Sequence, residues 1–144
     1  NIKNLGLPMP NCAILLSPWT DLSASGDSVQ ANAASDVMLT PGALKEMADH
    51  YLGERDRKAP LASPLFADLS GLPAIYIQAS ESEILLSDAQ RLVTRILAAG
   101  GEVKLTTWPK MPHVWQVLAA RIPEGKAAII SLGEFLKVRL TAKS

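Results

Sequence analysis

Three short strand-like runs, each followed by a helix-like segment, constrain the fold of this chain more than any other feature. The runs lie at residues 12–17, 74–79 and 103–108. The first two are almost continuously apolar, as expected of strands covered on both faces, whereas the third alternates apolar and polar residues and suits a strand nearer the sheet edge. The order β, α, β, α, β, α predicts an α/β fold with a doubly wound, mostly parallel sheet.

Local signals place the predicted helices. Thr40 followed by Pro41 predicts the start of a helix that ends at Gly53, with an apolar face of Leu44, Met47, Ala48, Tyr51 and Leu52. Ser87 or Asp88 is predicted to cap the second helix, whose apolar face is Ala89, Leu92, Val93, Ile96 and Leu97. Pro123 is predicted to break a short helical piece, and a last helix follows at 126–140, with Ile129, Leu132, Leu136 and Leu140 on one side. Residues 23–32 are predicted to form a surface loop.

Charge and cysteine content exclude several classes of function. The 144 residues carry 14 basic and 14 acidic side chains without a basic cluster, which argues against a nucleic-acid partner. No apolar run is long enough to span a membrane. The single cysteine, Cys12, cannot form an intrachain disulfide, and the chain has neither a zinc-type Cys/His spacing nor a glycine-rich phosphate loop.

Ionisable side chains follow two of the predicted strands. Glu81 and Glu83 come after the second strand, and His113 follows the third on a loop that Pro109 and Pro112 stiffen. The ends of parallel strands lie side by side, so a carboxylate could reach the imidazole and form two members of an acid–base–nucleophile triad. The alternatives are a histidine that only packs beside its neighbours and carboxylates that only face solvent.

Six motifs together resemble the C-terminal half of bacterial esterases of the hormone-sensitive-lipase family. They cover nearly the whole chain and are Ser-Pro-Trp-Thr-Asp-Leu-Ser (17–23), Ala-Ser-Pro-Leu (62–65), Leu-Pro-Ala-Ile-Tyr-Ile-Gln (72–78), Glu-Ile-Leu-Leu-Ser-Asp (83–88), Ala-Ala-Gly (98–100) and Met-Pro-His-Val-Trp-Gln (111–116). The resemblance implies the C-terminal portion of a single α/β-hydrolase domain over residues 1–144, with about residues 30–55 contributing to a cap over the substrate pocket.

The resemblance also implies a carboxylic-ester hydrolase that needs no metal or organic cofactor. His113 takes the place of the catalytic histidine. Family members usually show Gly-x-x-Asp after the preceding strand, whereas this chain has Ser80-Glu81-Ser82-Glu83, so the acid aligns with Glu83 and Glu81 is the alternative. Asp88 is interpreted as a helix cap. Contacts with a small-molecule ester substrate are expected from Trp19, Leu85, Val114 and Trp115, and the cap-helix face of Leu44, Met47 and Tyr51 is a further candidate.

The nucleophile elbow of the family, Gly-x-Ser-x-Gly, does not occur in this sequence. Residues 26–30 read Gly-Asp-Ser-Val-Gln, which lacks the second glycine and follows a predicted loop, so we interpret the likeness as coincidental. The chain is therefore expected to be a fragment that supplies acid and base to a serine on a missing N-terminal segment.

Other readings remain open from the sequence alone. The chain could be a catalytically silent binding or assembly piece, or part of an α/β-hydrolase that acts on peptides or amides. The resemblance further suggests a homodimer formed through the edge strand at 103–108. A cytoplasmic location is expected, because no targeting signal is evident.

Overall fold

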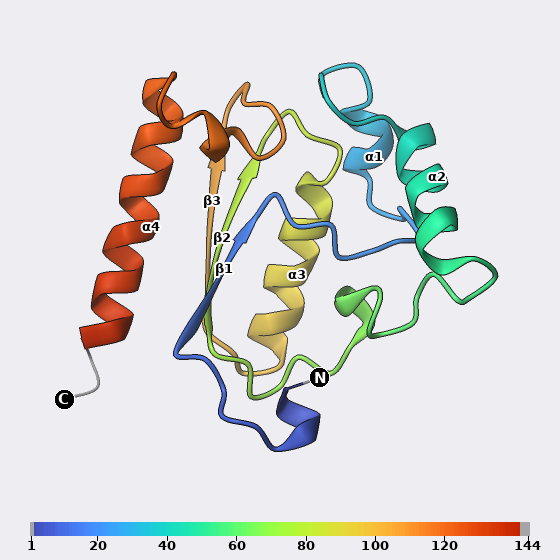
Figure 1. Cartoon of the computed structure of the whole chain (residues 1–144). Helices are drawn as coiled ribbons and strands as arrows, with labels where there is room; N and C mark the ends of the chain where they lie inside the picture. Colours follow the sequence, from blue (N-terminus) through green and yellow to red (C-terminus); the bar gives the residue numbers. More distant parts are fainter. Residues whose placement is uncertain (1, 142–144) are drawn as a thin grey trace.

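A parallel sheet of three strands forms the centre of the computed structural model, which describes residues 2–141 (Figure 1). The strands are β1 (Cys12–Leu16), β2 (Ala74–Ser80) and β3 (Val103–Trp108), in the spatial order β1-β2-β3. Cys12 pairs with Ala74 in the first ladder and Ile75 with Val103 in the second. The predicted strands and their parallel arrangement are confirmed.

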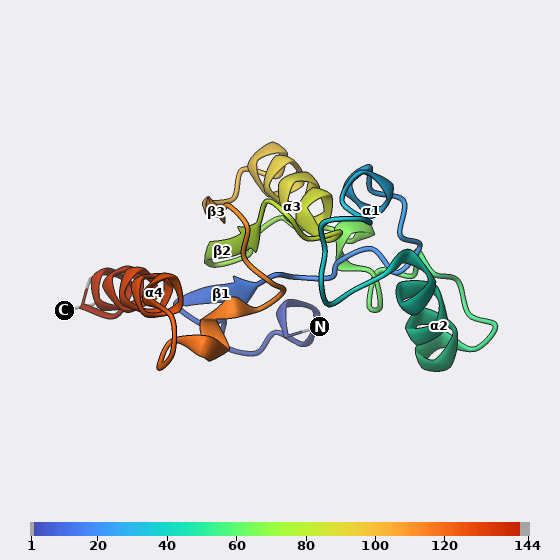
Figure 2. The same ribbon diagram turned by 90° about the horizontal axis from the view of Figure 1, so that it is seen from above.

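Helices cover both faces of this sheet. The α-helices are α1 (Ser28–Ala31), α2 (Pro41–Leu52), α3 (Leu86–Ala98) and α4 (Pro123–Thr141), and the 3-10 turns are η1 (Lys3–Leu5), η2 (Pro64–Phe66) and η3 (Trp115–Leu118). Figures 1 and 2 show α3 and α4 on opposite faces of the sheet, with α1 and α2 beyond α3. None of the helices in residues 2–141 is long and apolar enough to cross a membrane.

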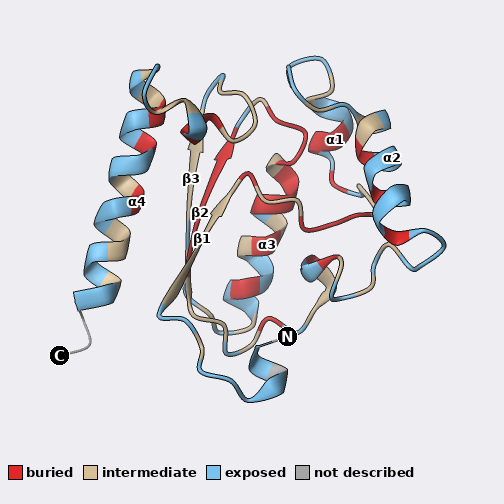
Figure 3. Ribbon diagram, in the orientation of Figure 1, coloured by how far each residue is buried: buried red, intermediate tan, exposed pale blue. Residues whose placement is uncertain are grey.

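The central strand β2 is buried on both faces because its side chains alternate between the two helical layers. Ile75, Ile77 and Ala79 join the cluster packed against α3. On the other face, Tyr76 meets the ring of Phe135 in α4 at 5.3 Å between centroids, and Gln78 Nε2 donates to the Ala128 carbonyl at 3.1 Å. Figure 3 shows β2 as the buried strand.

The strand β1 differs from its prediction as a strand covered on both faces. All five of its residues are only partly buried. Within residues 2–141 no strand pairs with its outer edge, since β2 is its single neighbour. β3 also lies at an edge of the sheet, as predicted.

The helix α2 begins and ends where its local signals predict. Thr40 Oγ1 accepts a hydrogen bond from the Ala43 N–H, and Gly53 ends the helix at a φ of 60°. The predicted apolar face is too wide. Leu44, Ala48 and Leu52 are buried in apolar clusters with the rest of the chain, whereas Met47 and Tyr51 are exposed, because only the i, i+4, i+8 stripe packs into these clusters.

Two predictions about α4 are wrong. The helix starts at Pro123, which takes its first turn, where proline is well tolerated. Its buried stripe is Gly125, Ala128 and Leu132, while Ile129 and Leu140 are exposed and Leu136 is half-buried. Small residues at this face allow close packing: a Cβ on Gly125 would lie 2.9 Å from the backbone nitrogen of Ala119.

Long-range contacts also overturn two local predictions. The predicted surface loop at 23–32 contains α1, in which Ser28 and Val29 are buried. The helix α3 starts at Leu86 without a side-chain cap, so neither Ser87 nor Asp88 is the predicted N-cap. Both side chains are instead buried against the segment that follows β1, where Ser87 Oγ lies 2.6 Å from Ser28 Oγ.

Candidate functional site

The loops that follow β2 and β3 lie side by side at the carboxyl end of the sheet (Figure 1). The Glu81 N–H donates to the Trp108 carbonyl at 2.9 Å, which extends the pairing of the two strands one residue into both loops. Lys110 and Val114 both have positive φ, at 58° and 53°, on either side of His113. Backbone of this kind is costly for residues other than glycine and is held only where surrounding contacts fix it.

His113 and Glu83 meet in this region. His113 Nδ1 lies 3.0 Å from Glu83 Oε2, and the carboxylate is 1% exposed whereas the imidazole side chain is 22% exposed. The hydrogen bond runs from Nδ1–H to Oε2, because a carboxylate oxygen only accepts. Within residues 2–141 no partner binds Nε2, so this nitrogen keeps its lone pair for a proton from another group.

The second carboxylate oxygen of Glu83 is also engaged. Oε1 accepts the Ser80 N–H at 2.7 Å, so each oxygen accepts one N–H donor. Glu81 behaves differently: its side chain is exposed and accepts from Thr107 Oγ1 at 2.9 Å. Of the two candidate acids, the structure brings Glu83 to the histidine and holds Glu81 against β3.

Two serines tie the histidine loop to its surroundings. Ser80 Oγ donates to the Met111 carbonyl at 2.6 Å, so the residue aligned with the family glycine links the two strand-end loops. Ser17 Oγ accepts the Val114 N–H at 3.2 Å, while the Ser17 N–H donates to the Gln78 carbonyl at 2.8 Å. These contacts fix the backbone on both sides of His113 to the ends of β1 and β2.

Ser17 was not predicted as a site residue. Its φ of 45° is unusual for serine, and it precedes Pro18, which favours extended backbone in the residue before it. The sequence carries no signal for this conformation, because the contact that fixes it spans 97 residues.

The predicted substrate contacts fall into two groups. Trp19 and Val114 are half-buried and keep some accessible surface. Leu85 and Trp115 are 2% and 0% exposed, so neither offers surface to a substrate in this structure. Trp115 packs against Trp108 at 5.9 Å between ring centroids, and Leu85 packs with Leu44, which fits a role in the core for both.

The serine that superficially resembles a nucleophile elbow is a packing residue. Ser28 is 8% exposed, and its Oγ donates to the Ile84 carbonyl at 2.6 Å. It also lies in a short helix that follows a loop instead of a strand. This environment agrees with the interpretation of the motif as coincidental.

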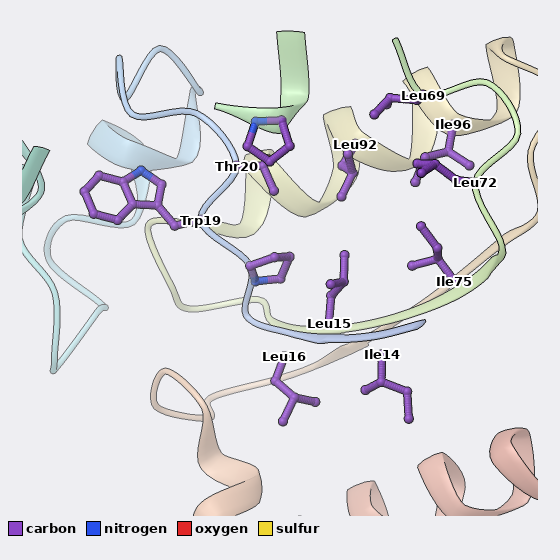
Figure 4. Close-up of a pocket in the computed structure, with 12 residues that line it drawn as sticks. Ile14, Leu15, Leu16, Trp19, Thr20, Leu69, Leu72, Ile75, Leu92 and Ile96 are labelled. Atoms are coloured by element: carbon purple, nitrogen blue, oxygen red, sulfur yellow. The ribbon is translucent and has the colours of Figure 1, made fainter. Parts of the chain in front are cut away.

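An apolar cavity of about 430 Å³ lies between β1 and α3 (Figure 4). Leu15 points toward Leu92 of α3, whereas Ile14 and Leu16 point to the opposite side of β1. Neither His113 nor Glu83 lines the cavity. Nearly all of its lining side chains are apolar, so it suits a hydrophobic side chain or element and offers few groups for polar chemistry.

Asp88 anchors the segment that carries Ser17 and Trp19. Its Oδ2 accepts the backbone N–H groups of Thr20 at 2.7 Å and Asp21 at 2.9 Å, and Oδ1 is buried without a partner. Burial raises the pKa of Asp88 to about 6, against the opposing effect of the two backbone donors; nearby Asp21 adds to the rise and Arg91 reduces it.

This shift predicts a pH dependence of stability that Asp88→Asn removes. The folded state binds the Asp88 proton more tightly than the unfolded state. The contribution of this proton to the free energy of unfolding is therefore fully present below about pH 4 and is lost as pH rises through about 6. A pKa difference of two units corresponds to roughly 3 kcal/mol of unfolding free energy. Urea unfolding at pH 4 and pH 7 should show a smaller loss of unfolding free energy on raising the pH in Asp88→Asn than in the parent. Equal losses would contradict this prediction.

Within residues 2–141 no cluster of three or more His, Cys, Asp or Glu side chains could hold a metal ion. A histidine oriented by a buried carboxylate can accept a proton at Nε2 and return it, which is the task of a general base and acid.

Comparisons with known proteins agree on one group. A family model described as alpha/beta hydrolase fold matches residues 1–117. The chain is 40% identical over 136 residues to an acetyl-hydrolase from Streptomyces hygroscopicus, covering 94% of this chain and 46% of that protein. It is 35% identical over 128 residues to an esterase from Acinetobacter venetianus, covering 88% and 42%.

Solved structures give the same result. An esterase from the bacterial hormone-sensitive lipase family superposes with a TM-score of 0.94 at 45% identity, covering 96% of this chain and 46% of that one. A hormone-sensitive lipase from a metagenome library gives a TM-score of 0.92 at 42% identity, covering 95% and 47%. The chain thus spans less than half the length of these relatives.

Proposed function

Because this chain belongs to the hormone-sensitive-lipase family of α/β-hydrolase-fold esterases, we propose that the full-length protein hydrolyses carboxylic esters through a Ser-His-acid triad. In this proposal His113 is the base and Glu83 the acid. The observation that carries it is the 3.0 Å contact between His113 Nδ1 and the buried Glu83 carboxylate.

The contact at Nδ1 leaves Nε2 of His113 available for the proton transfers of the proposed reaction. Nε2 takes the proton of the attacking serine hydroxyl as the tetrahedral intermediate forms, and then gives it to the departing alcohol. In deacylation a water molecule attacks the acyl carbonyl and loses a proton to Nε2, which then returns it to the serine oxygen as the acyl–oxygen bond breaks. Glu83 holds the Nδ1–H tautomer and stabilises the imidazolium that forms between these transfers.

The proposed nucleophile lies in polypeptide outside these 144 residues. The sequence lacks Gly-x-Ser-x-Gly, and the relatives are more than twice as long. Two features support a place for additional chain beside β1: the outer edge of β1 has no strand partner within residues 2–141, and the apolar cavity lies next to it.

Two further parts of the proposal rest on the family resemblance. Residues 30–55 would contribute to a cap, for which the exposed Met47 and Tyr51 on α2 offer apolar surface. Two copies would pair through β3, whose outer edge has no strand partner in the described part of the chain. Esters are favoured over amides as substrates because the relatives carry the names acetyl-hydrolase and esterase.

A serine-directed fluorophosphonate and p-nitrophenyl acetate test this function. We expect the full-length protein to release p-nitrophenol and to be labelled at one serine outside these 144 residues, whereas the 144-residue chain alone stays inactive. The isolated chain lacks a nucleophile and the donors that stabilise the oxyanion, which supply most of the rate enhancement.

Other outcomes would overturn the proposal in distinct ways. Label on Ser17 or Ser28, or turnover by the isolated chain, would place the nucleophile within these residues. A full-length protein that neither hydrolyses esters nor reacts with the probe would favour the alternative of a catalytically silent binding or assembly protein.

A further inference from the structure

The loop that carries Glu83 is held by three side chains from the segment after α1. Asn32 Nδ2 donates to the carbonyls of Glu81 and Glu83, both at 2.9 Å. Ser35 Oγ donates to the Ser82 carbonyl at 3.0 Å, and Asp36 Oδ2 accepts the Ile84 N–H at 2.8 Å. We call Asn32, Ser35 and Asp36 the acid clamp.

The acid clamp binds a backbone group of every residue from 81 to 84. The backbone-to-backbone hydrogen bond inside this loop is long by comparison, since the Glu83 nitrogen lies 3.5 Å from the Ser80 carbonyl oxygen. The backbone path at Glu83 sets the direction in which its side chain leaves the chain. That direction decides whether Oε1 reaches the Ser80 N–H while Oε2 reaches His113.

The acid clamp is itself well ordered by local contacts. The Asn32 carbonyl accepts the N–H groups of Ser35 at 3.0 Å and Asp36 at 2.9 Å. Asp36 Oδ1 accepts the N–H groups of Met38 and Leu39, both at 2.9 Å. These bonds tie the clamp residues to one another and to the start of the segment that leads into α2.

Apolar packing joins the same segment to the acid loop. Ile84 and Leu85 are buried in one cluster with Leu44 of α2, and Leu39 packs against it. The segment from Leu39 into α2 is therefore packed directly against Ile84 and Leu85.

We propose that Asn32 is a positioning residue for the acid, acting through the backbone carbonyls of Glu81 and Glu83. This rests on the proposed role of Glu83 in catalysis. Asn32 supplies two of the four clamp bonds from one amide group, and no other clamp side chain bonds the carbonyl of Glu83 itself.

Asn32→Ala in the full-length protein tests this role. We expect kcat to fall about tenfold with KM changed less than twofold, because the acid is misplaced while substrate contacts remain. Asn32→Asp keeps the shape but sets acceptor oxygens against two carbonyls, so its loss of kcat should be at least as large. Thr94→Ala removes a side-chain donor to the Gln90 carbonyl on the exposed face of α3 and should leave kcat unchanged.

A double-mutant cycle separates positioning from a general effect on folding. If Asn32 acts through Glu83, Asn32→Ala should change kcat less than twofold in a Glu83→Gln background. Hydrogen exchange by mass spectrometry adds a readout that needs no activity: amides of residues 80–84 should exchange faster in Asn32→Ala than in the parent, and equally fast in Thr94→Ala.

Three results would overturn the inference: a kcat of Asn32→Ala within twofold of the parent, a repeated tenfold loss in the Glu83→Gln background, or unchanged exchange of residues 80–84. Absence of ester hydrolysis by the parent protein would instead reject the proposed function and, with it, the catalytic part of this role. The exchange experiment would still decide whether Asn32 orders the loop.

Discussion

Replacing His113 with alanine in the full-length protein should lower kcat for p-nitrophenyl acetate by several orders of magnitude. The side chain is the proposed proton acceptor, and triad members act as a unit, so removing one eliminates most of the benefit of the others. Folding should be little affected, because the imidazole is partly exposed and its side-chain hydrogen bond is the one to Glu83. Steady-state kinetics and thermal unfolding measure the two effects separately.

The chain provides a matched control for this substitution. His50 is its only other histidine and lies exposed in the last turn of α2. His50→Ala should keep the kcat of the parent protein. Near-full activity in His113→Ala would remove His113 from the mechanism.

Glu83→Gln should lower kcat by about a thousandfold or more, which is the scale of loss when a triad acid becomes an amide. The geometry shows why an isosteric change is so costly. Both carboxylate oxygens accept N–H donors, from Ser80 and from His113. An amide has one oxygen, so its NH₂ group must face one of the two donors. It therefore either loses the Ser80 bond or forces the wrong tautomer on the imidazole.

Glu81→Gln is the matched control, two residues away in the same loop. We expect its kcat to stay within about threefold of the parent, because the side chain is exposed and its partner is Thr107 on β3. If Glu81→Gln proved the more damaging of the two substitutions, the acid would be Glu81.

The three strands and the helix α2 could be predicted because their signals are local. Thr40, Pro41 and Gly53 fix α2 through neighbouring residues, and strand runs are recognisable from periodicity alone. The burial of individual helix positions was harder to predict. Ile129 and Leu140 are apolar yet exposed, because the packed stripe of α4 is set by where small residues such as Gly125 allow close approach.

The candidate site also has features that could be predicted from the sequence and features that could not. The positions of Glu83 and His113 at neighbouring strand ends follow from the parallel order of the sheet, but spacing could not choose between Glu81 and Glu83. Thr107 and Ser80 make that choice through hydrogen bonds that depend on the folded loops. Asn32 and Ser17 were not predicted, since their partners lie about 50 and 97 residues away.

The strand register also bears on the entropy of chain closure. Pairing β2 with β3 brings Ile75 to Val103, whereas pairing β1 with β2 brings Cys12 to Ala74 and closes a loop more than twice as long. Each doubling of loop length costs roughly 0.6 kcal/mol of conformational entropy. Glu83 and His113 follow β2 and β3, the two strands that the shorter closure brings together. Of these two closures, the one that brings the acid and the base together therefore costs less conformational entropy. Ser17, which binds the histidine loop, is brought to the site by the longer closure.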